Sequence, residues 1–389
     1  MRSTGILLFL LAMHPVPAQV LHNINYSYQY APDRPFSFSF TMAEASTGLT
    51  VIYRFTRLEP GSGNAYTLQW ETRTSFGEKE GTLVGQSTTV TLDMDTVDGK
   101  FNLTSPGEKE SLLVGKVISE EDEQVWYFPK PILPYRSVEA FLVRDNIPVA
   151  DPYVDTKAQL WVEGYQQQQR ISVTRIEENF PPASPPFAED LPEVPMKLMP
   201  DTIFYISGEH RLDIERTGLY LLQQDTSSSR GLAFRIEDDY PRYTRLQNII
   251  SPLIYICTKQ EFDKLVRARN DKKEFDQLFL DIAGDIERAR QLLRSYFRRV
   301  EIANELFSSY KEGWKTDRGM MYLIFGEPDE VYKFSDREIW RYRERFDFQC
   351  MFIRAASLFD PESLVLVRSR KLEETWYETV DLWRKTRFQ

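Results

Sequence analysis

Cysteine and histidine are scarce in this chain, which has two cysteines and three histidines among 389 residues. A transition-metal site needs three or four such ligands at short spacings, and His14, His22, His210, Cys257 and Cys350 are too widely separated to provide them. We therefore predict neither a metal nor a cofactor. Sequence gives no distance between Cys257 and Cys350, so a disulfide and two buried thiols remain open alternatives.

Excess positive charge and long apolar runs are lacking as well. Acidic residues number 58 against 48 basic ones, which gives a net charge of -10. A field of that sign opposes binding to phosphates, so we exclude nucleic acid as a partner. No internal stretch approaches the roughly 20 apolar residues of a membrane-spanning helix, so we expect no transmembrane segment.

The first residues have the pattern of a signal peptide. An apolar run, Gly5 to Met13, follows Met1-Arg2, and Val16-Pro17-Ala18 places small residues at the positions that a signal peptidase recognises. We predict cleavage after residues 1–18, so that the mature protein begins at Gln19. The expected location is outside the cytoplasm, in the periplasm or at the outer membrane.

Alternating aromatic and polar residues indicate that residues 19–122 form a β-sandwich-like domain. The period of two is typical of half-buried strands, and turn residues separate the segments. The predicted strands are Asn25–Tyr30, Phe36–Phe40, Leu49–Phe55, Ala65–Thr72 and Ser87–Leu92. The aromatic residues fit a core better than an exposed platform for carbohydrate, although both interpretations start from the same residues.

Residues 123–240 form a second predicted β-rich domain. Its strand candidates are Ala158–Val162, Ile171–Val173, Thr202–Ile206 and Leu219–Leu222. A proline-rich stretch, residues 180–200, interrupts them. Prolines at this density exclude both helix and strand, so we predict a linker or a long surface loop.

A helical connector is predicted over residues 241–310. Thr258 and Glu261 have the spacing of a capping box, and a helix to about Arg269 should follow. Asp285 to Phe307 then has an apolar stripe at helical spacing and several arginines. We expect these arginines to be solvated and paired with nearby glutamates, with peripheral contact to a membrane or an acidic partner as the alternative.

The last predicted unit, residues 311–389, is an α+β module that contains a compact motif. The sequence Gly313-Trp-Lys-Thr-Asp-Arg-Gly319 precedes an apolar run, Met320 to Phe325, which we predict to be a strand. The motif residues that we assign to a structural or partner-binding role are Gly313, Trp314, Thr316, Asp317, Arg318, Gly319, Gly326, Pro328, Asp329, Trp340 and Tyr342. Glycine permits a turn, tryptophan buries a large ring, and Thr and Asp side chains bond nearby backbone N–H groups.

These residues resemble the GWxTD domain of bacterial proteins, and the resemblance covers roughly residues 251 to 389. It implies an exported protein with no established enzymatic activity. The resemblance therefore implies a module without naming a reaction.

Four carboxylates in this module allow a competing, enzymatic interpretation. Asp317, Glu327, Asp329 and Glu338 lie close together along the chain. A hydrolase would need two of them facing one cleft at a defined separation. We assign no catalytic residue, because carboxylates in turns usually bond backbone N–H groups.

The C-terminal residues are rich in tryptophan. Trp376 and Trp383 lie on one face of a final helix that starts near Leu372, and they form a candidate surface for a partner. The whole sequence favours a non-enzymatic binding or scaffold protein of the cell envelope, with other envelope proteins as partners, in a secretion or outer-membrane assembly. The alternatives are a carboxylate-dependent hydrolase of glycan or peptide and a carbohydrate-binding protein.

Overall fold

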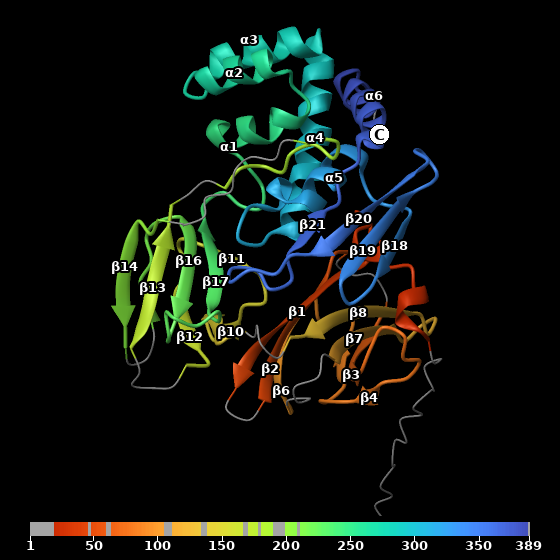
Figure 1. Cartoon of the computed structure of the whole chain (residues 1–389), viewed down its shortest axis with the longest axis vertical. Coiled ribbons are helices and arrows are strands. Elements are labelled where there is room, and N and C mark those ends of the chain that lie inside the picture. Colours follow the sequence, from red (N-terminus) through yellow and green to blue (C-terminus); the bar gives the residue numbers. More distant parts are fainter. Residues whose placement is uncertain are drawn as a thin grey trace, which may run out of the picture.

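The computed structural model describes residues 19–45, 48–59, 64–104, 111–133, 138–165, 170–177, 180–189, 199–207 and 211–387. Figure 1 shows two β-rich units, a helical segment, and a C-terminal sheet that a helix follows. The predicted fold class, a mixed chain with two antiparallel sandwich-like units before an α+β module, is confirmed. The predicted signal peptide lies outside the described residues, so cleavage before Gln19 remains a prediction.

Two sheets that share one core form the first unit. One sheet has the order β1-β2-β6 and the other β4-β3-β7-β8, with β5 paired to β3. The strands are β1 Phe36–Ala45, β2 Gly48–Arg57, β3 Tyr66–Arg73, β4 Thr82–Leu83, β5 Thr88–Val90, β6 Thr96–Thr104, β7 Ser111–Ser119 and β8 Val125–Ile132. Phe36, Phe38 and Phe40 of β1 are buried in this core together with Trp70. Their alternation is a core pattern and not an exposed platform.

Strand β8 continues the first unit past residue 122, where we predicted its boundary. Val125 to Ile132 pairs antiparallel with β7, from Ile118 back to Ser111. The strands that we predicted within residues 36–92 each overlap an observed strand.

The second unit also consists of two sheets around one core. Their orders are β10-β9-β12-β15 and β11-β17-β16-β13-β14, and all pairs are antiparallel except β11 with β17. The strands are β9 Phe141–Arg144, β10 Ile147–Pro148, β11 Tyr153–Asp155, β12 Leu160–Glu163, β13 Ile171–Ile176, β14 Thr202–Ile206, β15 Arg211–Leu212, β16 Gly218–Gln223 and β17 Leu232–Glu237. Val173, Leu222 and Phe234 lie in the shared core.

Helices occupy the middle of the chain. They are α1 Leu246–Ile250, the 3-10 turn η3 Ser251–Tyr255, α2 Lys259–Arg267, α3 Lys272–Ala283 and α4 Ile286–Phe307. The capping box of Thr258 and Glu261 is confirmed at the start of α2. Sequence analysis missed α3, although Asp271 caps its first turn and Gly284 ends it at a φ of 87°.

The C-terminal sheet is antiparallel with the order β18-β19-β20-β21. Its module comprises η4 Gly313–Lys315, α5 Asp317–Phe325, β18 Glu330–Lys333, β19 Arg337–Tyr342, β20 Phe348–Arg354, β21 Leu364–Leu366, η5 Arg370–Leu372 and α6 Glu373–Arg384. The predicted strand Met320 to Phe325 is wrong, because these residues belong to helix α5. All six of their side chains are buried, so the run has no polar face from which a helical period could be recognised.

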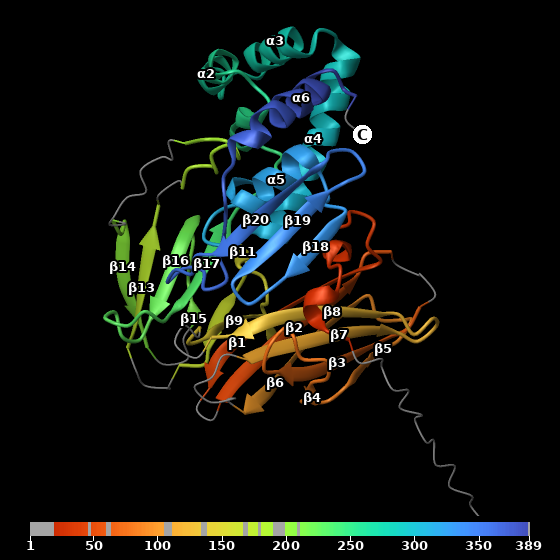
Figure 2. The same ribbon diagram turned by 45° about the vertical axis from the view of Figure 1, so that its right-hand side comes forward.

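The residues nearest the predicted cleavage point pack against the C-terminal module. They form the 3-10 turns η1 Leu21–Asn23 and η2 Ser27–Gln29, so the predicted strand Asn25–Tyr30 is wrong. The Tyr26 N–H donates to the Val331 carbonyl at 2.8 Å, which joins this segment to β18. Figure 2 shows these turns between β18 and the first sandwich, where the Tyr28 hydroxyl donates to the Tyr127 carbonyl of β8 at 2.7 Å. A contact across some 300 residues leaves no local trace in the sequence.

The described part of the proline-rich stretch, residues 180–189, has no helix or strand, as predicted, but it is packed against the module. Ala183 N–H donates to the Lys315 carbonyl at 2.9 Å, and Ser369 N–H donates to the Pro186 carbonyl at 2.8 Å. The Phe187 ring lies 6.3 Å from that of Trp376. This segment therefore covers the motif instead of linking two free units.

Across the described ranges, the helices are all too short or too polar to cross a bilayer.

Candidate functional site

The motif begins at Gly313 in η4, whose backbone lies against the backbone of α4. A Cβ atom on Gly313 would lie 2.1 Å from the Ala303 carbonyl oxygen and 2.6 Å from the Asn304 Cα atom. Asn304 accepts a hydrogen bond from the Trp314 backbone N–H at 3.2 Å and donates to the Pro241 carbonyl at 2.9 Å. Position 313 therefore requires glycine, because backbone atoms of α4 occupy the space of a side chain.

Trp314 anchors the motif in the largest core of the molecule. Its side chain is buried, and its indole N–H donates to the Tyr243 hydroxyl at 3.1 Å. The Tyr255 ring meets it edge to face at 6.0 Å. Tyr243 precedes α1 and Tyr255 is the last residue of η3, so one tryptophan joins the helical segment to the module.

Thr316 and Gly319 start helix α5. The Thr316 hydroxyl donates to the Gly313 carbonyl at 2.7 Å and accepts from the Gly319 N–H at 3.0 Å, so it caps the helix. A Cβ on Gly319 would lie 1.8 Å from the Gly313 carbonyl oxygen. The backbones of the two glycines therefore lie in close contact, and a side chain at position 319 would clash with the Gly313 carbonyl.

Asp317 connects the start of α5 to the last strand of the sheet. One carboxylate oxygen accepts from the Leu366 N–H at 3.0 Å, and the other pairs with the Arg368 guanidinium at 2.8 Å. Arg368 also donates to the Ser184 carbonyl at 3.2 Å. One carboxylate therefore holds together α5, β21 and the proline-rich segment.

The turn after α5 is fixed by contacts of its own. Gly326 has a φ of 87°, and its carbonyl accepts from the Tyr342 hydroxyl at 3.0 Å. Pro328 is buried. Asp329 accepts from the Glu344 N–H at 3.0 Å, and its carbonyl accepts from the Asn25 side chain at 3.0 Å. This turn is therefore joined both to the end of β19 and to the N-terminal segment.

Glu338 is the centre of a buried ionic cluster. Its carboxylate accepts from the Tyr30 hydroxyl at 2.7 Å and from the Trp340 indole N–H at 2.5 Å. The Arg318 and Lys333 cations lie 3.8 and 3.9 Å away. Burial alone would raise the pKa of Glu338, but the charges of Lys333 and Arg318 hold it below its usual value. Burial lowers the pKa of Lys333 to about 8.

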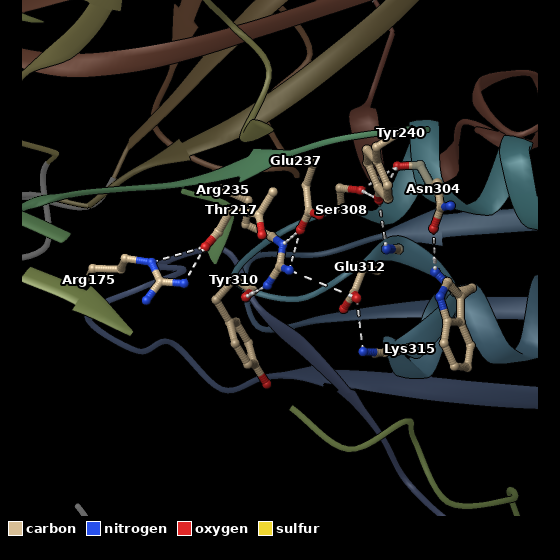
Figure 3. A network of polar contacts seen from close by, with 12 residues as sticks. Arg175, Thr217, Arg235, Glu237, Tyr240, Asn304, Ser308, Tyr310, Glu312 and Lys315 are labelled. Atoms are coloured by element: carbon tan, nitrogen blue, oxygen red, sulfur yellow. Dashed lines mark hydrogen bonds and ion pairs between the residues drawn. The ribbon is translucent and has the colours of Figure 1, made fainter. Parts of the chain in front are cut away.

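A second polar network joins the motif to the second sandwich, as Figure 3 shows. Arg235 of β17 pairs with Glu237, donates to the Tyr310 carbonyl at 2.9 Å and lies 3.9 Å from Glu312. Glu312 in turn accepts from the Lys315 ammonium at 2.9 Å. Sequence analysis missed Arg235 and Glu237, since nothing in the pattern of a strand distinguishes an arginine that pairs across units.

The four candidate carboxylates are held by different partners. Asp317 contacts Arg368, Glu338 contacts Tyr30 and Trp340, and Asp329 contacts backbone N–H groups, as described above. Burial and the nearby Asp33 raise the pKa of Glu327, which lines neither of the two cavities described below. In the ranges that the structure describes, no group of three or more His, Cys, Asp or Glu side chains has the arrangement of a metal site.

Trp376 and Trp383 of α6 are buried inside the molecule and do not form an exposed surface. The Trp383 indole N–H donates to the Ile324 carbonyl at 3.0 Å, and the Arg299 guanidinium lies 4.9 Å from its ring centre. Trp376 packs against Phe325 with ring centres 5.9 Å apart. Intramolecular packing therefore accounts for both residues.

Cys257 and Cys350 are separate thiols and form no disulfide with each other. Burial raises the pKa of Cys257 to about 12 and also raises that of Cys350. A raised thiol pKa keeps both groups protonated at neutral pH, so neither is an activated nucleophile.

Two cavities adjoin the motif: one lies where the module meets the first sandwich, and the other is also lined by Phe141 and Phe234 of the second sandwich. Their volumes are about 450 and 380 Å³. Arg318 of the motif lines both, Glu338 lines the larger, and Thr316 and Asp317 line the smaller. Residues of the motif therefore line both cavities, but their polar groups already form hydrogen bonds or ion pairs with other residues of the chain.

The chain therefore combines two β-sandwich-like units with a C-terminal α+β module that contains this motif. Residues 218–385 match the model of the GWxTD domain, so the chain carries that domain. The match begins at β16, upstream of residue 251 where the resemblance was placed, and it therefore includes the strand that carries Arg235. No curated protein matches the sequence.

Proposed function

We propose that this chain is an exported, non-enzymatic binding or scaffold protein of the bacterial cell envelope, acting in a secretion or outer-membrane assembly. The observation that supports this proposal is that the polar groups of the motif bond to other parts of the same chain. Trp314 bonds Tyr243, Thr316 caps α5, and Asp317 bonds Arg368 and Leu366. Each polar group holds one element of the chain to another, which is what a rigid frame for a binding surface needs.

The carboxylates give less support to a hydrolase. A general acid of a glycosidase needs a raised pKa, whereas Lys333 and Arg318 hold the pKa of Glu338 below its usual value. Asp317 has both oxygens engaged by Leu366 and Arg368. Neither carboxylate is arranged to transfer a proton to a substrate.

Crosslinked affinity purification of the full-length protein from the envelope fraction, followed by mass spectrometry, tests the binding function. A reproducible set of partners, absent from an untagged strain, is the expected result. Recovery of the free monomer alone contradicts a scaffold function.

Sequencing the N-terminus of the same material tests export. A chain that starts at Gln19 is the expected result. An intact Met1 in the soluble cytoplasm would contradict the proposed location.

A further inference from the structure

Residues 19–30, which follow the predicted cleavage point, form a strap between the first sandwich and the C-terminal sheet, as Figure 2 shows. Leu21 and Tyr26 of this strap are fully buried, and Tyr30 is 4% exposed. These side chains share one apolar core with residues of both neighbours, namely Leu112, Val114 and Tyr127 of the first sandwich and Val331, Trp340 and Phe352 of the module. The strap is therefore packed between the two units and contacts both of them.

Polar contacts fix the strap to the first sandwich. The Tyr28 hydroxyl, which donates to the Tyr127 carbonyl, also accepts from the Tyr127 N–H at 2.9 Å, so it satisfies both backbone groups of one residue of β8. The Gln29 side chain donates to the same carbonyl at 2.8 Å. At the start of the strap, the buried Arg73 guanidinium donates to the Gln19 carbonyl at 2.7 Å. These bonds hold both ends of the strap to one sheet.

The strap is bonded to the C-terminal module as well. The Asn25 side chain accepts from the Val331 N–H at 2.8 Å, and the Val331 carbonyl accepts from the Tyr26 N–H at 2.8 Å. Val331 belongs to β18, which is the outermost strand of its sheet. The Tyr322 hydroxyl of α5 donates to the Tyr30 carbonyl at 3.0 Å. The strap therefore satisfies backbone groups on the edge of β18 just as it does on β8.

Beside the strap, the facing surfaces of the two units leave a cavity. It is the cavity of about 450 Å³, and Tyr28, Gln29 and Tyr30 of the strap form part of its wall. An ion pair crosses directly from one unit to the other, between Lys130 and Glu362 at 3.2 Å. Its side chains are 31% and 40% exposed, and exposed pairs contribute little to stability. The buried contacts of the strap are therefore a stronger link between the units than this direct pair.

The strap leads into the sandwich strands at its C-terminal end. Residues 31–35 connect it to β1, and Pro32 and Pro35 restrict the backbone of this connection. With the signal peptide removed as proposed, Gln19 is a free and exposed N-terminus. Local opening costs less free energy than global unfolding, and the ends of a chain open most readily. The strap can therefore leave its site while the strands of the sandwich stay paired.

We propose that residues 19–30 are a latch on the interface between the first sandwich and the C-terminal module. In the docked state the strap holds the two units together and closes one wall of the cavity. Its release uncovers Leu112 and Val114 of β7 and the backbone groups of Tyr127 and Val331, and it opens the cavity while both units remain folded. The latch goes beyond the proposed binding function, because it belongs to the chain alone and needs no partner.

Hydrogen exchange of the purified protein, resolved by peptide over a series of urea concentrations, measures the release. Amides of the strap and of β18, such as those of Tyr26 and Val331, should exchange together and at least about tenfold faster than those of α5 and β7. Their exchange should also depend less on urea, because release exposes less surface than global unfolding does. Strap amides that exchange only as slowly as those of α5 would overturn the proposal, since the strap would then open only with the whole fold.

Two conservative variants weaken the bonds that close the latch and keep its buried apolar side chains. Asn25→Ala removes the acceptor of the Val331 N–H, and Tyr28→Phe removes the hydroxyl that bonds both backbone groups of Tyr127. Each should speed exchange of the strap by about threefold to tenfold and leave exchange of β7 unchanged. The double variant, with both substitutions, should show the sum of the two effects on a logarithmic scale. Unchanged exchange of the strap in the double variant would contradict the latch.

Tyr205→Phe is the matched control for the loss of a tyrosine hydroxyl. Tyr205 lies on β14 of the second sandwich, outside the strap, and its side chain is 52% exposed. This variant should leave exchange of the strap as it is in the unaltered protein. Equal effects of Tyr205→Phe and Tyr28→Phe on the strap would show that the bond to β8 does not hold it.

The distance between two spin labels tests whether the units separate when the strap leaves. Thr82→Cys in the first sandwich and Gln349→Cys in the module place the labels at exposed positions. Burial raises the pKa of both native thiols, Cys257 and Cys350, so they resist labelling at neutral pH.

In the labelled protein the double variant should add a second, longer distance, whereas Tyr205→Phe should keep a single one. Neither measurement involves a partner, so a failure to recover envelope partners would contradict the scaffold function and leave the latch intact. A single, unchanged distance in the double variant, with fast exchange of the strap, would overturn the latch and leave the scaffold function intact.

Discussion

Trp70 of the first sandwich and Trp314 of the C-terminal module are equally buried, at 1% exposure each, yet they are held differently. Trp70 packs among aromatic rings, including Phe38 and Phe40 at 5.6 and 5.1 Å, and in the part of the chain that the structure describes its indole N–H has no partner. Trp314 donates to Tyr243 at 3.1 Å. Trp70 is therefore held by apolar packing, whereas Trp314 is also held by a specific hydrogen bond.

This difference extends to the other tryptophans of the module. Trp340 donates to Glu338 at 2.5 Å and Trp383 to the Ile324 carbonyl at 3.0 Å. A buried polar group that is satisfied fixes the orientation of a ring as well as its burial. The module is therefore expected to tolerate changes of shape less well than the sandwich does.

The largest expected effect is at Gly313. Gly313→Ala places a methyl group at 2.1 Å from the Ala303 carbonyl, so α4 and η4 cannot keep their contact, and destabilisation should exceed about 4 kcal/mol. The matched control is Gly284→Ala, which has a φ of 87° but no atom within 4 Å and should cost about 1–2 kcal/mol. Soluble yield and urea unfolding measure both. Equal stabilities for the two variants would contradict the close contact.

Replacing each tryptophan by phenylalanine sharpens the comparison directly. Trp314→Phe leaves the Tyr243 hydroxyl without its donor, whereas Trp70→Phe removes an N–H group that has no partner. Trp314→Phe should therefore cost about 1–3 kcal/mol more than Trp70→Phe. Hydrogen exchange resolved by peptide reports each unit separately. A larger loss in the sandwich would show that the polar contact does not distinguish the cores.

A smaller effect is expected at the pair that joins α2 to α6. Hydrogen bonding to Arg384 lowers the pKa of Glu261 from 4.5 to about 2. A carboxyl with a lowered folded-state pKa stabilises the fold above its ordinary pKa, and this contribution is lost as the pH falls from 4.5 towards 2. The stability difference between the unaltered protein and Glu261→Gln should therefore shrink over that range.

Glu287→Gln is the control for this measurement. Glu287 pairs with Arg290 on the exposed face of α4, where its side chain is 75% exposed, and exposed pairs contribute little. Denaturant unfolding at several pH values gives both differences. A Glu261→Gln difference that stays constant with pH would contradict the assigned pairing.

The sandwich strands could be predicted because each has one buried face. Along Phe36 to Phe40, aromatic residues alternate with serines, and the aromatic side chains are the buried ones. The prediction failed for α5, where every position from Gly319 to Phe325 is buried and no period remains. It failed again at residues 25–30, whose contacts lie near Val331 and Glu338. Local patterns record the exposure of one segment and contain no information about its distant partners.

For the motif, sequence analysis named the residues and assigned them a structural or partner-binding role, but it could not give their contacts. The capping by Thr316 and the need for glycine at position 313 follow from residue chemistry. The pairing of Asp317 with Arg368 does not, because an arginine 51 residues away gives no local signal. The network of Arg235 and Glu312 was missed for the same reason.

The central claim is that the motif is architectural, and the stability of Asp317→Ala tests it most directly. Removing this carboxylate leaves the Leu366 N–H without its acceptor and Arg368 without its carboxylate partner, so thermal unfolding of the full-length protein should show a loss of about 1–2 kcal/mol. Catalytic carboxylates are held at some cost to the fold, and their removal tends to be neutral or stabilising. A lower Tm for Asp317→Ala is the predicted result, and an unchanged or higher Tm would contradict the account.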